Sequence, residues 1–404
     1  MRDSHAVEIR SNFSSRQVSR GWWAVVARFL VHGLIVSTWV SRIPAIKESL
    51  HLNDGVLGLA LLGAAVGSLA AIPVCGYLVN RFGSSRIANW SAVGFCVSLA
   101  FPALAVNGAT LFLALVGFGI MAGANDVSMN AQGVSVEHLL GTPTMSRFHA
   151  MFSIGGMAGA ALGGAIAARH VCPLLHLVIA GLILLAVTAA TTPLMLDLHD
   201  PEAIEKSHGL PIRSIPPVLL AICAVGFCIL VAEGAMADWT AVYLKQVLGA
   251  GPGIAAAGYA VFSAGMAIFR LLGDAITVRL GHGRTVRTGA LVASIGLAFA
   301  LSMQSPYWAL PGFAATGAGL SVIIPLVFAS GGRIPGVSRG AGIATVTGLG
   351  YLGFLFGPPA IGFLSQLSSL RYALWLIVAL TILSAALAGS IGRLYRSATA
   401  SDIA

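Results

Sequence analysis

The chain has 404 residues, of which 57% are hydrophobic and 9% are charged, with a formal net charge of +9. A soluble domain usually carries about 25% charged residues, so this composition excludes an ordinary soluble fold and indicates a polytopic membrane protein. The basic residues stand singly or in small groups between apolar runs, which argues against a nucleic-acid-binding surface.

Twelve apolar runs are long enough to cross a membrane as helices, since roughly 20 residues span the hydrocarbon. They cover residues 22–41, 55–79, 87–106, 109–133, 147–169, 172–195, 215–240, 252–278, 286–304, 307–330, 340–365 and 370–392. Residues 1–20 are polar and basic without a signal-peptide core, and are expected to be a cytoplasmic tail. The sequence predicts an all-α polytopic membrane protein with six-helix bundles at 21–196 and 215–393, a cytoplasmic linker at 197–214 and a cytoplasmic tail at 394–404.

Basic residues and short repeats indicate the orientation and the division into halves. Most Lys and Arg residues fall in the tails and the even-numbered loops. Because basic residues favour cytoplasmic loops, both termini are expected in the cytoplasm, with the chain in a bacterial inner membrane. Three patterns recur at nearly one offset: R-x-G-x-x-R at 81–86 and 279–284, G-x-G at 117–119 and 317–319, and a tryptophan at 39 and 239. This recurrence predicts two pseudo-symmetric halves, an architecture common in secondary transporters.

One loop carries a family resemblance. The stretch "GYLVNRFGSSR", residues 76–86, resembles the loop signature of the major facilitator superfamily, roughly G-x-L-x-D-R-x-G-R-R. Asn80 stands at the position of the usual Asp, and losing that acid weakens the gating ion pair that the signature implies. The gating residues implied by the resemblance and its repeat are Gly76, Asn80, Arg81, Gly83, Arg86, Arg279, Gly281 and Arg284.

Three further stretches resemble a narrower group. "WVSRIPAIK" (39–47), "FHAMFSIGG" (148–156) and "EGAMADWTAVYL" (233–244) resemble the MosC/YbjJ-like group, related to the fucose-permease branch. The resemblance implies that the first, fourth, seventh and tenth helices line a central cavity that opens alternately to each side. In fucose-type proton symporters an acid in the first helix and a Glu in the fourth take part. Here Ala122 occupies the Glu position and the first helix has no acid, so that coupling scheme does not transfer directly.

Four acids lie within the apolar runs: Asp126, Glu233, Asp238 and Asp274. A charge at the bilayer centre costs about 2.5 to 3.5 kcal/mol even on insertion scales, so each acid must face water, a partner or a functional passage. Arg270 and Asp274 are four residues apart, a spacing that lets their side chains meet on one helix. We expect them to form a structural ion pair or a latch.

Arg28 and Asp126 should lie at similar depth, roughly 10–12 Å inside the cytoplasmic edge at 1.5 Å per residue. If both face the cavity they could pair, and separation would then favour protonation of the acid, which makes a proton switch. A permanent structural bridge is the alternative. His32 lies near the middle of the first helix, where it either exchanges a proton or simply accepts a hydrogen bond.

Glu233 is expected to face the cavity and to bind a proton, a cationic group or hydroxyl groups. Asp238 is either a second coupling group or an interfacial acid paired with solvent, Arg42 or Lys245. The candidate solute contacts are Asn125, Asn130, Glu233, Trp39 and Trp239. The amides could instead hold helices together, and the tryptophans could be membrane-interface anchors.

These features predict a secondary active transporter, coupled to protons, for a small polar solute of sugar or polyol type. The alternative is a proton-driven efflux pump for amphipathic compounds, since residues 155–164 resemble a glycine-rich antiporter motif, although they lack its proline. An enzyme or a solute sensor is disfavoured, because the sequence shows no cluster of a nucleophile with a base and no loop long enough to be an output domain.

No Walker-type loop is found and the five cysteines match no metal spacing, so no cofactor or metal is predicted. The expected partners are the solute, the proton and the bilayer, with the chain as a monomer.

Overall fold

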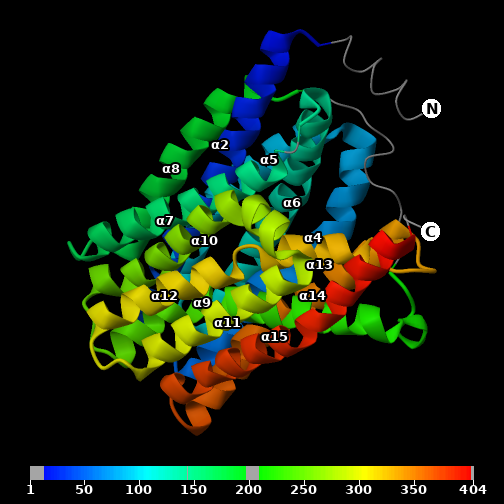
Figure 1. The fold of residues 1–404 in the computed structure, drawn as a ribbon. Coiled ribbons are helices and arrows are strands. Elements are labelled where there is room, and N and C mark those ends of the chain that lie inside the picture. Colours follow the sequence, from blue (N-terminus) through cyan, green and yellow to red (C-terminus); the bar gives the residue numbers. More distant parts are fainter. Residues whose placement is uncertain (1–12, 143, 197–208, 402–404) are drawn as a thin grey trace.

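The structure, a computed structural model, describes residues 13–142, 144–196 and 209–401, without the side chains of residues 212 and 396–401. Twelve helical segments of the described chain are long and apolar enough to span a membrane, as the sequence predicts (Figure 1). The first bundle contains α2 (Ser15–Val40), α3 (Ile43–Ser49), α4 (Asp54–Phe82), α5 (Ser84–Ser98), η1 (Phe101–Leu104), α6 (Gly108–Leu140), α7 (Met145–Ala167), α8 (Pro173–Thr191) and η2 (Thr192–Leu194).

The second bundle follows η3 (Ile212–Ser214). It contains α9 (Pro217–Gln246), α10 (Pro252–Leu280), α11 (His282–Ser302), α12 (Pro306–Leu320), α13 (Ile323–Gly331), α14 (Arg339–Leu367) and α15 (Leu370–Ser401). The two bundles pack together along two seams, α7 against α10 and α4 against α14. The prediction of an all-helical chain in two six-helix bundles is therefore confirmed.

Several boundaries differ from the apolar runs. Helix α2 begins inside the expected tail because Ser14 and Gln17 form a reciprocal capping box around its first turn. Helix α15 continues through the expected C-terminal tail as far as Ser401. The first and tenth spans are each divided in two, between α2 and α3 and between α12 and α13. The remainder of the expected tails and most of the expected linker, at residues 1–12, 197–208 and 402–404, lie outside the described residues.

The repeated R-x-G-x-x-R loop has the same backbone shape in both bundles. Gly83, between α4 and α5, has φ 86° and ψ 148°. Gly281, between α10 and α11, has φ 79° and ψ 155°. Residues with a Cβ rarely adopt this conformation, whereas glycine does so without steric cost. The glycine of the repeat is thus required by the sharp turn at the same place in each half.

The seam between α4 and α14 is tight at one end and open at the other. A methyl group built on Gly58 would lie 2.5 Å from the carbonyl oxygen of Pro358, and one built on Gly362 would lie 2.5 Å from that of Asp54. These contacts lie where α3 leads into α4 and α14 leads into α15, which we call the far end. The opposite end, where α2 begins and α15 ends, is called the terminus end.

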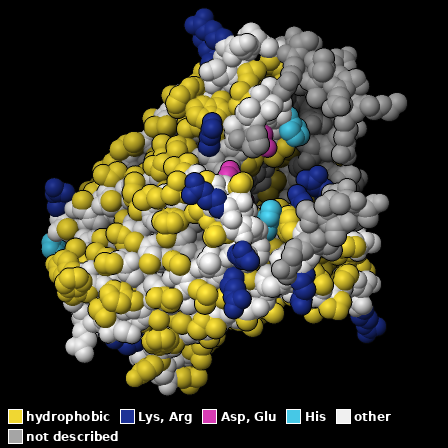
Figure 2. Space-filling model, in the orientation of Figure 1, with side chains coloured by type: hydrophobic (Ala, Val, Ile, Leu, Met, Phe, Trp, Pro, Cys, Tyr) yellow, Lys and Arg dark blue, Asp and Glu magenta, His cyan; other side chains and the backbone are white. Residues whose placement is uncertain are grey.

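The same two helix faces separate towards the terminus end. Gly76 lies about five helical turns along α4 from Gly58, and Gly348 about four turns along α14 from Gly362, so each returns to nearly the same face. A methyl group built on Gly76 or on Gly348 would lie within 4 Å of no atom in the part of the chain that the structure describes. Figure 2 shows a hollow on the side of the molecule towards both chain ends, bordered by basic, histidine and acidic side chains. The bundles therefore diverge from a closed far end.

Candidate functional site

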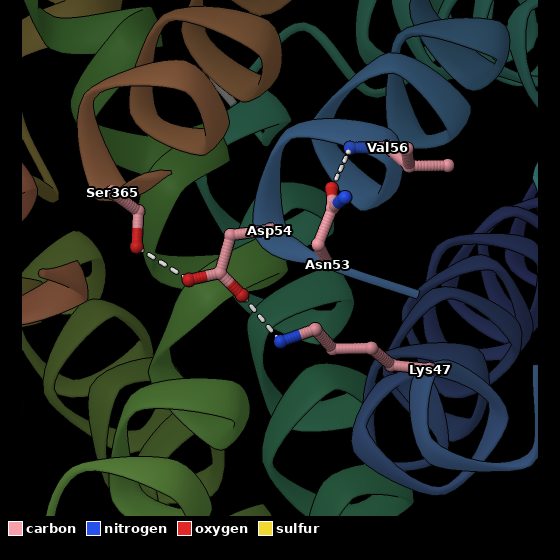
Figure 3. A network of polar contacts seen from close by, with 5 residues as sticks. All are labelled: Lys47, Asn53, Asp54, Val56 and Ser365. Atoms are coloured by element: carbon pink, nitrogen blue, oxygen red, sulfur yellow. Dashed lines mark hydrogen bonds and ion pairs between the residues drawn. The ribbon is translucent and has the colours of Figure 1, made fainter. Parts of the chain in front are cut away.

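A buried polar bridge joins the two bundles at the far end (Figure 3). Asp54, at the start of α4, accepts hydrogen bonds from the Lys47 ammonium at Oδ1 and from the Ser365 hydroxyl at Oδ2. Lys47 lies in the first bundle and is only 4% exposed. Ser365 lies on α14 in the second bundle and is also buried. A carboxylate thus neutralises a buried ammonium and ties α4 to α14 at the same time.

A second ion pair crosses the same end nearer the surface. Lys245, in the last turn of α9, donates to Glu48 Oε2 of α3. The Glu48 side chain is 70% exposed, so water screens this pair far more than the buried bridge. The buried bridge was not predicted from the sequence. Its only sequence signal is a lysine and an acid placed on either side of one short loop.

Near the middle of the spans, carboxylates from opposite bundles lie within electrostatic range of a common tyrosine. Asp126 lies on α6 and Glu233 on α9, and Tyr351 of α14 interacts electrostatically with both. Both acids are half-buried. Asp126 accepts a hydrogen bond of 3.1 Å from Asn130 Nδ2. Glu233 Oε1 is buried and has no hydrogen-bond partner within the described residues.

Further groups of the second bundle surround Glu233. Tyr259 of α10 interacts electrostatically with Glu233, Asp238 and Arg270. At the next residue, a methyl group built on Gly234 would lie 3.0 Å from the ring of Phe354, which is close packing. Three acids, one guanidinium and several aromatic rings therefore share this region. Such a set can bind a proton or a solute that donates hydrogen bonds.

Arg270 links the bundles rather than the expected acid on its own helix. It donates to Ser153 Oγ of α7 at 2.8 Å and lies within electrostatic range of Glu233. The side chain of Asp274 is exposed. In the part of the chain that the structure describes, no ion pair joins Arg270 to Asp274. The expected latch on α10 is therefore replaced by a contact from α10 to α7.

Arg28 and Asp126 do not pair. Arg28 is 1% exposed and its Nη2 donates to Asn89 Oδ1 of α5 and, at 2.9 Å, to Thr192 Oγ1 of η2. It therefore points towards α5 and η2, while Asp126 bonds to Asn130. The predicted depths made the pair possible, but depth along a helix does not fix direction around it, which turns by about 100° per residue.

His32 and Asn125 form a contact inside the first bundle. Asn125 Nδ2 lies 2.9 Å from His32 Nδ1, and the side chains are 2% and 7% exposed respectively. The Asn125 amide also bonds to Met129 Sδ and lies 3.5 Å from Ser91 Oγ. With both ends of its amide engaged, Asn125 joins α2, α5 and α6 in this conformation.

Asn125→Ala is therefore expected to destabilise the first bundle. Removing the amide leaves a buried imidazole nitrogen without its partner, which costs about 1–3 kcal/mol. The thermal unfolding midpoint of the detergent-purified protein should fall. Asn130→Ala is the matched comparison, because Asn130 is half-buried and bonds to its own helix. An equal fall in both variants would contradict a structural role specific to Asn125.

The two tryptophans lie in the apolar core in this conformation. Trp39 is 4% exposed and Trp239 is 0% exposed, and Trp239 Nε1 is buried without a partner among the described residues. Neither indole offers an open face for stacking on a solute. The groups expected to pair with Asp238 are engaged elsewhere, since Arg42 donates to His176 Nδ1 at 2.8 Å and Lys245 pairs with Glu48.

The gating loop lies at the terminus end. Arg81 donates to the Tyr77 hydroxyl at 3.0 Å and lies over the ring of Phe82. Asn80 Oδ1, at the usual position of the acid, is buried without a hydrogen-bond partner in the described chain. The side chains of Arg86, Arg279 and Arg284 are exposed.

Three aromatic residues near the central acids were missed from the sequence: Tyr259, Tyr351 and Phe354. Tyr351 and Phe354 pack together with their ring centroids 6.2 Å apart. For Tyr351 and Phe354, the sequence signal was the presence of aromatic residues within the glycine-rich run 348–362. The composition of an apolar span, however, does not distinguish a tyrosine that faces a cavity from one that faces lipid.

Comparisons with known proteins agree with this architecture. The Major Facilitator Superfamily model matches residues 24–336. An uncharacterised MFS-type transporter of Yersinia pestis is 35% identical over 367 residues, covering 90% of this chain and 94% of that protein. The membrane protein MosC of Rhizobium meliloti is 31% identical over 363 residues, covering 90% of this chain and 88% of MosC.

Two solved structures share the fold at low sequence identity. A bacterial homologue of the human lysosomal transporter Spinster, in an inward-facing and unoccupied conformation, matches with a TM-score of 0.74 and 14% identity, covering 95% of this chain and 99% of that chain. A D-xylose–proton symporter matches with a TM-score of 0.71 and 15% identity, covering 91% and 97% respectively.

Proposed function

Because the chain belongs to the major facilitator superfamily, in its MosC-like group of transporters rather than among enzymes, we propose that it is a secondary active transporter driven by protons. Its solute is small and polar, of sugar or polyol type. It works by alternating access in a bacterial inner membrane. Both termini are cytoplasmic, so the terminus end opens to the cytoplasm and the far end faces the opposite side.

The contrast between the two ends carries this proposal. At the far end the bundles touch through Gly58 and Gly362 and are tied by Asp54. At Gly76 and Gly348, the same faces of α4 and α14 meet no atom of the described chain within 4 Å. Rocking of one bundle against the other would exchange the closed and open ends, which is how repeated halves give alternating access.

Asp126 and Glu233 are the proposed coupling groups. They come from different bundles and share Tyr351 as an electrostatic neighbour. Glu233 Oε1 has no hydrogen-bond partner among the described residues, and an unsatisfied buried acceptor is stabilised by a proton or by a hydroxyl group of the solute. His32 and Asp238 are secondary coupling candidates. Asn130 and Tyr351 are the proposed solute contacts beside the acids.

Reconstituted transport tests the proposal. Purified protein in liposomes is offered labelled sugars and polyols with an inward proton gradient, with and without a protonophore that removes it. Accumulation that the protonophore abolishes supports proton symport. Expulsion of amphipathic dyes in exchange for protons, without any sugar or polyol accumulation, would favour the efflux alternative and overturn the proposed function.

A further inference from the structure

A separate cavity lies at the far end, away from Asp126 and Glu233. It has a volume of about 210 Å³ and takes its lining from both bundles. The first bundle contributes the α2–α3 junction, around Arg42 and Glu48, and the α7–α8 loop, around His170 and Cys172. The second bundle contributes Lys245 and the start of α10. Nothing in the proposed transport cycle uses this cavity.

A buried guanidinium forms part of its wall. Arg42 is only 2% exposed, and it is held by bonds from Nε to His176 Nδ1 at 2.8 Å and from Nη2 to the Val171 carbonyl oxygen at 3.1 Å. No acceptor in the described chain bonds to Nη1, and no acid pairs with this guanidinium. The side chain is therefore fixed in place with donor capacity left over and its charge uncompensated.

The helix dipoles at the cavity also favour an anion, while its other charges cancel. Lys245 is a second cation, and it is paired with Glu48, the one acid among the described lining residues. Helices α8 and α10 both begin at the cavity, at Pro173 and Pro252, and no side chain of the described residues caps either start. Each uncapped start presents first-turn N–H groups and a partial positive charge. Two such starts converge here with the Arg42 guanidinium, which no acid of the described chain pairs with.

We propose that this cavity binds a small oxyanion, a phosphate or a carboxylate group, with Arg42 as its principal ligand. The volume admits a group of that size with a few waters. Because both bundles line the cavity, the bound anion stabilises the closed far end and disfavours its opening, as linkage requires. Only this consequence for transport rests on the proposed function; the binding itself does not.

Cys172 provides a native reporter for binding. It is exposed and lines the cavity, whereas the other four cysteines are buried. The rate of maleimide labelling of the detergent-purified full chain should fall several-fold and saturably with inorganic phosphate or with acetate, relative to sodium chloride at equal ionic strength. Cys172→Ser identifies any labelling at other sites and sets the background.

Variants of the cations that line the cavity distinguish anion binding at this site from a general effect of salt on the labelling rate. Arg42→Gln should remove the protection, while Arg169→Gln should keep it, because Arg169 is an exposed arginine of the same end that does not line the cavity. If Arg42→Gln fails to fold, Lys245→Gln is the second variant and should weaken the protection. The absence of saturable protection in the unmodified chain, or equal protection in all variants, would overturn the proposal.

Two membranes distinguish the source of the anion. The protein is placed in nanodiscs of phosphatidylcholine or of phosphatidylglycerol, without added phosphate. Protection by phosphatidylglycerol alone identifies a lipid headgroup as the occupant, whereas protection that requires added phosphate or acetate in both membranes identifies a soluble anion. Labelling needs no transport, so a failed transport assay and a failed binding assay are distinguishable.

Discussion

Glu233→Gln is expected to reduce proton-driven solute accumulation to the level of protein-free liposomes. Glutamine keeps the shape of the side chain and its capacity for hydrogen bonds, but it cannot take up and release a proton. Exchange of labelled for unlabelled solute across the membrane, which needs no net proton transfer, should persist. The measurements are gradient-driven uptake and counterflow in the same liposome preparation.

Asp126→Asn should behave in the same way, because Asp126 is the carboxylate that approaches Tyr351 from the first bundle. Asp274→Asn is the matched control, since Asp274 is an exposed acid on α10 outside this cluster. Its uptake and pH dependence should match those of the unmodified protein. Unchanged uptake and unchanged pH dependence in both Glu233→Gln and Asp126→Asn would remove these carboxylates from the mechanism.

The architecture was predictable because its signals are long and redundant. Twelve apolar runs fix the number of spans. The repeated loop marks the two halves, and the positive φ of Gly83 and Gly281 gives the physical reason for its glycine. The start of α2 differs from the predicted boundary because of a short-range interaction: the capping box of Ser14 and Gln17 extends α2 into the expected tail.

The direction of side chains was much less predictable than their depth. Arg28 and Asp126 were expected at one depth, but Arg28 turns to Asn89 and Thr192 instead. Trp239 was considered for stacking on a solute and is completely buried. An apolar helix in a membrane has little amphipathic contrast, so its sequence does not show which face meets the cavity, a neighbouring helix or lipid.

Contacts between the two halves were the least predictable feature. Asp54 looks from the sequence like an ordinary acid in the first turn of a helix, and Ser365 looks like an ordinary polar residue near the end of α14. Their bond joins residues far apart in the chain. Nothing local in the sequence encodes such a pairing. It follows from the way in which α4 and α14 approach through Gly58 and Gly362.

Asp54→Asn is expected to open the far end. The variant leaves the 4%-exposed Lys47 without its carboxylate, and breaking a buried ion pair from one side costs about 3–5 kcal/mol. The Lys47–Asp54 pair itself lies within the first bundle. We expect its loss to penalise the closed form, because separation of the bundles would expose the unpaired Lys47 ammonium to water. A bias of this size changes the ratio of closed to open forms by roughly 100-fold or more, since about 1.4 kcal/mol is a factor of ten.

Spin labels across the far end measure this change. Ser49→Cys on α3 and Ser368→Cys after α14 place labels on exposed residues of different bundles, in a Cys172→Ser background that removes the exposed native thiol. Pulsed dipolar spectroscopy should show a population at longer separation in Asp54→Asn that is minor in the parent. A distance distribution identical to the parent would contradict the role of the bridge.

The comparison with Glu48→Gln decides why the bridge matters. Asp54→Asn and Glu48→Gln each remove one acid from a polar contact between the bundles at the far end. The Glu48 side chain is 70% exposed, whereas Lys47 and Ser365, the partners of Asp54, are buried. Exposed pairs are typically worth about 0–1 kcal/mol, so Glu48→Gln should shift the distances little. Ser365→Ala, which leaves the ammonium and carboxylate paired, should fall between the two. The distance shift should therefore decrease in the order Asp54→Asn, Ser365→Ala, Glu48→Gln if the desolvation of Lys47 controls closure of the far end. Equal shifts in all three variants would instead mean that the number of inter-bundle bonds controls it.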